Sequence, residues 1–198
     1  MTNTVDVDKR RFLTNATTIV GGFGAIAVAI PFISSLSPSA KAEAAGVPVT
    51  LDISKLTVGQ MITVEWRGKP VWVLRRSSET LSALPTLVPR LRDPDSDNPE
   101  QQPNYCQNPN RSIRDDILIL VGICTHLGCS PTHRPELAPD DLGPDWKGGF
   151  FCPCHGSTFD LAGRVYSGVP APSNLVVPPH HYTGDGQLLI GADAKGVA

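Results

Sequence analysis

The chain has 198 residues, with 19 acidic and 17 basic side chains and a formal net charge of -2. This balance argues against a nucleic-acid-binding protein, which would usually carry a strong basic excess, so no nucleic acid is expected as a partner. Hydrophobic residues make up 40% of the chain, which excludes a disordered protein, and its 18 glycines and 19 prolines favour a loop-rich β protein. The five cysteines are an odd number, so they cannot all pair in disulfides.

The N-terminal part of the chain is predicted to cross a membrane. Residues 12–40 contain no charged side chain. Within them, residues 16–36 would span about 31 Å as a helix, which is enough for the ~30 Å hydrocarbon core of a bilayer. We therefore assign residues 12–36 to a transmembrane helix, in which small residues such as glycine are tolerated.

Basic side chains on one side of this span predict its orientation. Lys9, Arg10 and Arg11 precede the span, whereas only Lys41 follows it closely. The positive-inside rule then places residues 1–11 in the cytoplasm as a tail and the bulk of the chain on the other side of the membrane. The string KRRFL, which contains these three basic residues, resembles a twin-arginine export signal, although a lysine stands where the first arginine should be.

The segment after the span leaves two questions open. Residues 37–46 are small and polar and indicate a linker, so we assign residues 37–47 to a flexible neck, but the same alanine, lysine and glutamate residues also favour a helical extension of the span. The strings AKA and AEA within this segment have the form of a signal-peptide cleavage site. A cleaved signal peptide is therefore the alternative to a retained anchor.

Residues 48–198 are predicted to form an all-β domain, an antiparallel sandwich of small sheets. Short apolar or alternating segments bounded by turn residues predict the strands, and the continuous run ILILVGI indicates one strand buried on both faces. A short helix is expected between Ser78 and Leu91, and residues 93–111 are expected to form an exposed loop. The expected strands are Val49–Ile53, Ile62–Trp66, Val71–Leu74, Ile117–Ile123, Leu175–Val177 and Gln187–Ile190.

Two hexapeptides concentrate cysteine and histidine side chains. They are CTHLGC (124–129) and CPCHGS (152–157), and each follows a strand-like run, so two loops from adjacent strands are expected to bring these side chains together. Converging thiolates and imidazoles indicate zinc, an iron–sulfur cluster or a redox disulfide. One cysteine and one histidine from each loop match the ligand set of a two-iron cluster in which both histidines bind one iron.

The two hexapeptides resemble the cluster-binding boxes of the Rieske iron–sulfur protein of bacterial cytochrome bc1 complexes. The resemblance extends over the whole chain, from the basic tail and single span through a small-residue neck to the β domain. The segment GVPAP (168–172) is similar to the proline loop that covers the cluster in this family. The resemblance implies a Rieske-type antiparallel β sandwich with a small cluster-binding subdomain, at residues 121–172.

The resemblance also implies the ligands of one [2Fe-2S] cluster per chain. Cys124 and Cys152 would bind one iron, and His126 and His155 would bind the other. Because two neutral imidazoles replace two thiolates, the cluster is less negative and accepts an electron more readily than an all-cysteine cluster. His155 would contact quinol and accept its proton, with His126 beside it at the catalytic site.

Further residues around the cluster take their roles from the same resemblance. Cys129 and Cys154 would form a disulfide, and the Ser157 hydroxyl would donate a hydrogen bond to a cluster sulfur. The chain departs from the family at Phe159, where high-potential members usually carry tyrosine. Phenylalanine lacks the hydroxyl that donates to a ligand cysteine, so we expect a lower midpoint potential in this chain.

The function implied by the resemblance is electron transfer within a membrane complex. The chain would be a subunit of quinol–cytochrome c reductase in the bacterial inner membrane, with its Rieske domain in the periplasm. It would take an electron and a proton from quinol at cytochrome b and pass the electron to cytochrome c1, within a dimeric complex. The alternative is the Rieske subunit of another periplasmic redox enzyme such as arsenite oxidase, and a structural zinc module would also use two cysteines and two histidines.

Residues outside the two hexapeptides are interpreted as structural. Cys106 matches no motif position and is expected to be a free thiol. His133 is expected to be a loop histidine, and His180 and His181 are expected to lie at the surface or to have a structural role.

Overall fold

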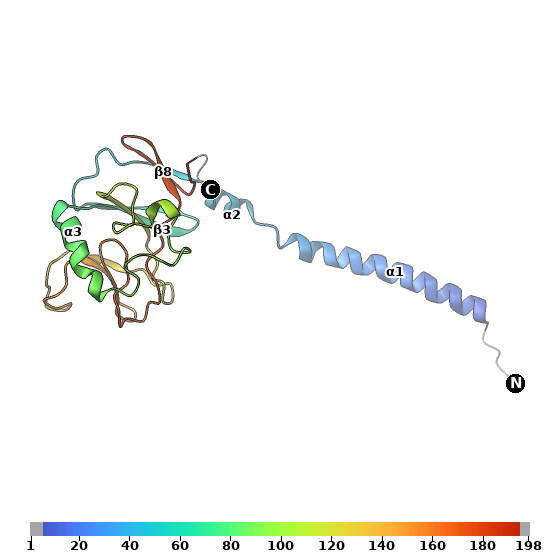
Figure 1. Cartoon of the computed structure of the whole chain (residues 1–198). Coiled ribbons are helices and arrows are strands. Elements are labelled where there is room, and N and C mark those ends of the chain that lie inside the picture. The colour runs from blue at the N-terminus through green and yellow to red at the C-terminus, as the bar shows by residue number, and fades with distance from the viewer. Residues whose placement is uncertain (1–5, 195–198) are drawn as a thin grey trace. The chain divides into compact units, whose positions relative to one another are not determined.

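The computed structural model describes residues 6–194, and the chain divides after Ala44 into two compact units, which are described separately (Figure 1). The first unit contains helix α1 (Val7–Ser34), which is long and apolar enough to cross a membrane. This helix begins before the predicted span of residues 12–36, so the basic side chains of residues 9–11 lie on the helix itself. The most apolar 18-residue window of α1 has a mean hydropathy of 1.9.

Several polar side chains in and next to α1 bond to its own backbone. The Asp6 carboxylate caps its N-terminus by accepting hydrogen bonds from the amides of Asp8 and Lys9, both at 3.1 Å. Thr14 and Thr17 donate their hydroxyls to the carbonyl oxygens four residues earlier, each at 2.8 Å. Such internal bonds are required in a lipid environment, which offers no other partner. A short helix α2 (Ala40–Ala45) lies in the neck, which corresponds to the helical alternative for these residues.

The second unit, which we call the β domain, contains three small antiparallel sheets and confirms the predicted all-β class (Figure 1). The first sheet has the order β1 (Val49–Asp52), β9 (Gln187–Ile190), β8 (His180–Gly184). The second has the order β2 (Met61–Trp66), β3 (Lys69–Arg75), β4 (Ile117–Val121). The third has the order β5 (Thr132–Arg134), β6 (Gly149–Cys152), β7 (Ser157–Phe159). Connecting segments contain the short helices α3 (Ser78–Ala83), η1 (Leu84–Arg90) and η2 (Asn104–Cys106).

The second sheet lies between two hydrophobic cores, which is why its strands are so apolar. Successive side chains of a strand point to opposite faces of the sheet. In β3, Val71 and Val73 belong to the core shared with the first sheet, whereas Trp72 and Leu74 belong to the core shared with the third. All five residues of β4 are buried, which confirms that the run ILILV is a strand covered on both faces.

One predicted strand is wrong. Residues 175–177 are extended but do not form a ladder with a single partner, because their amides bond to separate segments. The amide of Leu175 donates to the carbonyl of Gly163, and the amide of Val177 donates to the carbonyl of Gln101, each at 2.8 Å. The apolar side chains of this segment correctly indicated that it is buried. They did not indicate a strand, because its backbone bonds go to two separate segments.

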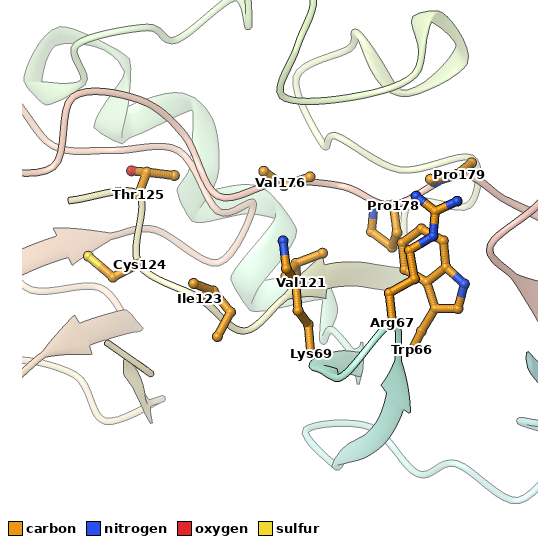
Figure 2. Close-up of a pocket in the computed structure, with 10 residues that line it drawn as sticks. All are labelled: Trp66, Arg67, Lys69, Val121, Ile123, Cys124, Thr125, Val176, Pro178 and Pro179. Atoms are coloured by element: carbon orange, nitrogen blue, oxygen red, sulfur yellow. The ribbon is translucent and has the colours of Figure 1, made fainter. Parts of the chain in front are cut away.

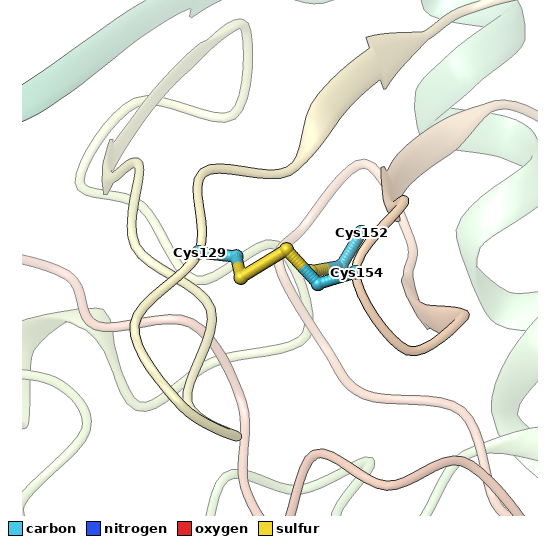
Figure 3. A group of neighbouring side chains, drawn as sticks. All are labelled: Cys129, Cys152 and Cys154. Atoms are coloured by element: carbon cyan, nitrogen blue, oxygen red, sulfur yellow. A yellow bond between two sulfur atoms is a disulfide. The ribbon is translucent and has the colours of Figure 1, made fainter.

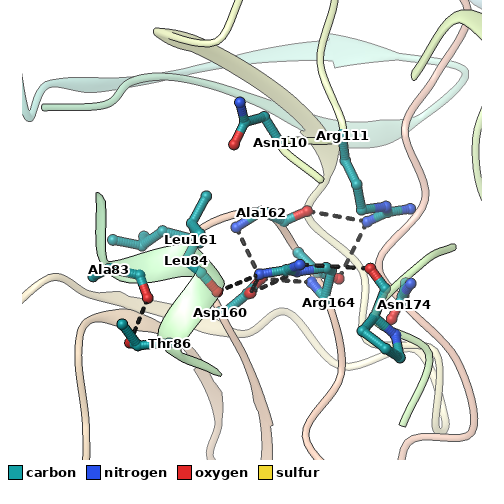
Figure 4. A network of polar contacts seen from close by, with 12 residues as sticks. Ala83, Leu84, Thr86, Asn110, Arg111, Asp160, Leu161, Ala162, Arg164 and Asn174 are labelled. Carbon is teal, nitrogen blue, oxygen red and sulfur yellow. Dashed lines mark hydrogen bonds and ion pairs between the residues drawn. The ribbon is translucent and has the colours of Figure 1, made fainter. Parts of the chain in front are cut away.

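The prediction of an exposed loop at residues 93–111 is right for most of the segment, but four of its residues are buried: Ser96, Gln102, Cys106 and Arg111. Cys106 and Arg111 in this segment have no exposed surface. The Arg111 guanidinium donates to the carbonyl oxygen of Ala162 at 3.1 Å (Figure 4). It also donates to the carbonyl oxygen of Leu175 at 2.8 Å. A buried guanidinium needs such acceptors, so part of the polar composition of this segment supports a packed interior network.

Candidate metal centre

The two hexapeptides form loops of the same local build. In the first loop the amide of Gly128 donates to the carbonyl of Cys124 at 3.1 Å, and in the second the amide of Gly156 donates to the carbonyl of Cys152 at 2.9 Å. Both glycines have positive φ, 84° and 74°, a conformation that a side chain would strain. Each loop is therefore a tight turn that closes on its first cysteine.

The two loops come from different sheets, which corrects the expectation of adjacent strands. The first follows β4 of the second sheet, and the second connects β6 and β7 of the third sheet. The sheets meet where Trp72 stacks on Phe150, with ring centroids 5.0 Å apart. Gly122, just before the first loop, allows this approach, because a Cβ there would overlap the Trp72 indole.

Cys129 and Cys154 form a disulfide that joins the two loops (Figure 3). This confirms the expected pairing. The sulfur of Cys152 lies within 4.8 Å of both of these sulfurs. Because Cys129 and Cys154 are bonded to each other, they cannot act as thiolate ligands, and the disulfide packs against the expected ligand Cys152.

The four expected ligands divide into buried thiols and accessible imidazoles. Cys124 and Cys152 are each only 2% exposed, whereas His126 is half-buried and His155 is exposed. The two imidazole rings are close together, with centroids 4.7 Å apart and planes at 88°. This donor set fits a [2Fe-2S] cluster bound by two thiolates on its buried side and two imidazoles on its exposed side.

The environment of the buried thiols favours a metal over a free thiolate. Burial raises the pKa of the Cys124 thiol, and the neighbouring Cys152 thiol raises it further, while the Ser157 hydroxyl lowers it by hydrogen bonding. Two thiols at such close range cannot both ionise cheaply without a cation between them, because their charges repel in a desolvated site. The pair therefore suits bound iron, which stabilises both thiolates.

Ser157 and the proline loop are in direct contact. Ser157 is fully buried at the start of β7, and its Oγ accepts a hydrogen bond from the amide of Ala171 at 3.0 Å. From the first hexapeptide, Thr125 Oγ1 donates to the carbonyl of Ser173 at 2.7 Å. Residues 168–172 therefore contact the second hexapeptide, and the residue that follows them, Ser173, contacts the first.

Phe159 lies on the face of β7 that carries Ser157. In the antiparallel pairing of β6 with β7, Cys152 is opposite Ser157 and Phe150 is opposite Phe159. Residues two apart in a strand share a face, so the Phe159 ring belongs to the surface that presents Cys152. Both Phe159 and Cys152 are part of one buried cluster with Cys124, and Phe159 brings no polar atom to it.

A cavity of about 390 Å³ lies beside the first loop (Figure 2). Cys124 and Thr125 line one part of it, and Arg67 and Lys69 contribute the basic side chains. Its remaining lining is mainly apolar and contains neither His126 nor His155. The cavity therefore adjoins the centre from the side of the buried thiols.

The structure places the other histidines and the spare cysteine away from the centre. His133 lies in strand β5 instead of a loop, with its ring 5.5 Å from that of Phe150, and burial lowers its pKa. His180 is buried and its Nδ1 bonds to the carbonyl of Pro178 at 2.8 Å, as a structural histidine should. Cys106 is a free thiol, as predicted, and it is fully buried.

Comparisons with known proteins decide between the possible metal centres. A family model described as the Rieske [2Fe-2S] domain matches residues 105–179. The chain is 60% identical to the ubiquinol-cytochrome c reductase iron-sulfur subunit of Allochromatium vinosum over 185 residues, which cover 93% of this chain and 89% of that protein. The chain belongs to the family of ubiquinol-cytochrome c reductase iron-sulfur subunits. Its domain is thus a Rieske domain with a [2Fe-2S] cluster, and a structural zinc module is excluded.

Further relatives carry the same description. The ubiquinol-cytochrome c reductase iron-sulfur subunit of Blastochloris viridis is 39% identical over 96% of this chain and 96% of its own length. That of Rhodospirillum rubrum is 41% identical over 92% of this chain and 91% of its own length. A solved hyperthermophilic respiratory Complex III is 27% identical over 90% of this chain and 98% of that chain, with a TM-score of 0.46.

The N-terminal segment has its own family match. A model described as the ubiquitinol-cytochrome C reductase Fe-S subunit TAT signal matches residues 2–39. This confirms the likeness to a twin-arginine signal, despite the lysine in place of the first arginine. The protein is therefore the electron-transferring Rieske subunit of ubiquinol–cytochrome c reductase, an oxidoreductase complex, with an N-terminal helix suited to a membrane anchor.

Two residues at the centre were not found from the sequence. Thr125 stands inside the first hexapeptide, but its bond to Ser173 depends on the path of a segment far along the chain. Arg92 donates to two carbonyls of the proline loop, and no motif surrounds it. A lone arginine in a polar segment carries no sequence signal for such a contact.

Proposed function

We propose that this chain accepts one electron and one proton from quinol at cytochrome b and then delivers the electron to cytochrome c1. The observation that carries the proposal is the division of the centre into two buried thiols and two accessible imidazoles. Cys124 and Cys152 would hold the inner iron, and His126 and His155 the outer iron. Quinol would then approach the centre from the side of the imidazoles.

The bound cluster supplies a one-electron acceptor, with a potential in the roughly -150 to +300 mV range of such centres. His155, the more exposed imidazole, would accept the quinol proton at its ring nitrogen that does not bind iron. Leu127, beside His126, is 72% exposed, and this supports docking of the imidazole side against an apolar protein surface.

The proposal includes the orientation of the chain in the membrane. Residues 1–11 would form the cytoplasmic tail, residues 12–36 the membrane span, residues 37–47 the neck, and residues 48–198 the periplasmic domain. The basic residues before the span and the match to an export signal support this orientation. The names of the relatives favour a ubiquinol–cytochrome c reductase over the alternative of an arsenite oxidase subunit. The dimeric state of the cytochrome bc1 complex is part of the proposal.

Electron paramagnetic resonance of the dithionite-reduced full chain tests the ligand assignment. We expect a rhombic signal with an average g value below that of the free electron, because mixed thiolate and imidazole ligation makes the two irons inequivalent. His155→Ala should abolish this signal, since one ligand of the outer iron is lost. Cys106→Ser is the matched control, because its buried thiol lies in neither loop, and it should keep the signal. A silent wild-type protein containing one zinc ion, or an unchanged His155→Ala spectrum, would contradict the proposal.

The potential of the centre is expected to depend on Phe159. In Phe159→Tyr, the new hydroxyl would extend from the face that presents Cys152 and donate to its sulfur. A hydrogen bond stabilises the more negative, reduced cluster by about 1 kcal/mol, so the midpoint potential should rise by roughly 40 mV. Redox titration followed by electron paramagnetic resonance measures the shift. Phe151→Tyr, on the opposite face of the same hairpin, is the control, and an equal rise in both variants would contradict the argument.

A further inference from the structure

Arg92 makes two hydrogen bonds to the proline loop, residues 168–172, from outside the hexapeptide loops. Its Nη1 donates to the carbonyl of Ala171 at 2.8 Å, and its Nη2 donates to the carbonyl of Val169 at 2.9 Å. The guanidinium is a planar group with donors at a fixed spacing, so it can bridge two carbonyls that a lysine ammonium could not fix together. In the described part of the chain, Arg92 forms no ion pair with a carboxylate.

The backbone places Arg92 firmly beside this loop. The amide of Arg92 donates to the carbonyl of Val165 at 3.0 Å, and the amide of Ser167 donates to the carbonyl of Arg90 at 2.8 Å. Residues 90–92 therefore run along the segment that leads into the proline loop. The main chain therefore holds Arg92, an exposed residue, within reach of the two carbonyls.

The same residue of the proline loop also contacts Ser157, through the peptide group that precedes it. The carbonyl of Ala171 accepts from Arg92, while the amide of Ala171 donates to Ser157 Oγ at 3.0 Å. A serine hydroxyl has one hydrogen and two lone pairs. Once a lone pair is taken by the Ala171 amide, the hydroxyl hydrogen must point elsewhere, and the expected ligand Cys152 lies directly opposite Ser157 in the pairing of β6 with β7.

We propose that Arg92 is a positioning residue for the redox centre: it holds the carbonyl of Ala171, and the amide of the same residue orients the Ser157 hydroxyl so that its hydrogen is donated to sulfur. The proposal rests on the proposed function and on the role at the cluster that the family resemblance implies for Ser157. Loss of the bridge lets the proline loop move, weakens the Ala171 bond and leaves the hydroxyl free to rotate. The reduced cluster then loses part of a hydrogen bond, so the midpoint potential falls.

Redox titrations of the membrane-extracted full chain test this with Arg92→Lys, Arg92→Gln, Ser157→Ala and the two double variants. Both Arg92 variants should lower the midpoint potential by a similar amount, smaller than the fall caused by Ser157→Ala. In the Ser157→Ala background they should cause no further fall, because residues that act in series are not additive. A wild-type potential in Arg92→Lys, with a fall only in Arg92→Gln, would show that the charge alone acts and would overturn the proposal. Equal falls with and without Ser157 would also overturn it.

Hydrogen exchange of the peptide covering residues 168–174, measured by mass spectrometry, gives a second readout that needs no electron transfer. Exchange should be faster in both Arg92 variants than in the wild type. Arg114→Gln, which removes a surface arginine paired with Asp116 elsewhere in the β domain, should leave this peptide unchanged. Wild-type exchange in both Arg92 variants would overturn the proposal. Failure of the proposed function is recognised separately, by the absence of the rhombic signal from the wild-type protein.

Discussion

Cys129→Ser is expected to destabilise the β domain by about 3.5 kcal/mol, because a disulfide that closes a loop of this length restricts the unfolded chain by that amount. The two cysteines are 25 residues apart, and their bond joins the loops that carry all four expected ligands. The loss should therefore appear first at the centre. We expect the variant to bind less iron per chain and to lose its cluster at a lower denaturant concentration than the wild type.

Denaturant titrations followed by cluster absorbance and tryptophan fluorescence measure this effect. Wild-type protein treated with a thiol reductant should unfold at the same midpoint as Cys129→Ser, because both lack the same bond. Cys106→Ser is the matched control: it removes a buried thiol outside the disulfide, so the reductant should still lower its midpoint as in the wild type. A variant Cys129→Ser whose midpoint still falls with reductant, or equals that of the oxidised wild type, would contradict the prediction.

Strand β4 and the metal centre could be predicted because short sequence patterns determine both of them. The run ILILV predicted a strand buried on both faces, and β4 (Ile117–Val121) is such a strand, since separate cores pack on its two sides. The cysteine and histidine spacing predicted a metal centre, and the family resemblance added the disulfide of Cys129 with Cys154. These features depend on local patterns of a few residues, which a sequence displays directly.

What could not be predicted depends on contacts between distant segments. Arg111 lies in a polar segment and is nevertheless buried, because carbonyls from residues 162 and 175 converge on it. Arg92 reaches Ala171 in the proline loop, and Thr125 reaches Ser173 just after it, through side-chain bonds across many intervening residues. No periodicity or spacing encodes such partners, since each bond depends on how loops fold back.

A cluster of buried charges lies next to the second hexapeptide loop and illustrates such distant contacts (Figure 4). Asp160 and Arg164 are 0% and 1% exposed, and Asp160 Oδ2 accepts from Arg164 Nε at 2.8 Å. Arg76 and Arg111 are also buried, and burial lowers the pKa of each to about 10, while the Asp160 carboxylate raises both. Among the described residues, three guanidinium groups are therefore buried together with a single buried carboxylate, that of Asp160.

Asp160→Asn is therefore expected to lower the free energy of unfolding by about 3–5 kcal/mol, the range for removing one partner of a buried ion pair. Asparagine can still accept the amides of Ala162 and Arg164, which bond to Asp160 Oδ1 at 2.9 and 2.8 Å, so the loss comes mainly from the unpaired guanidinium charge. Asp141→Asn is the matched control. Asp141 makes equally short bonds to Arg134 but is exposed, so solvent screens the pair and the midpoint of unfolding should hardly change. Denaturant titration compares the two variants, and a similar small effect in both would show that burial does not strengthen this charge network.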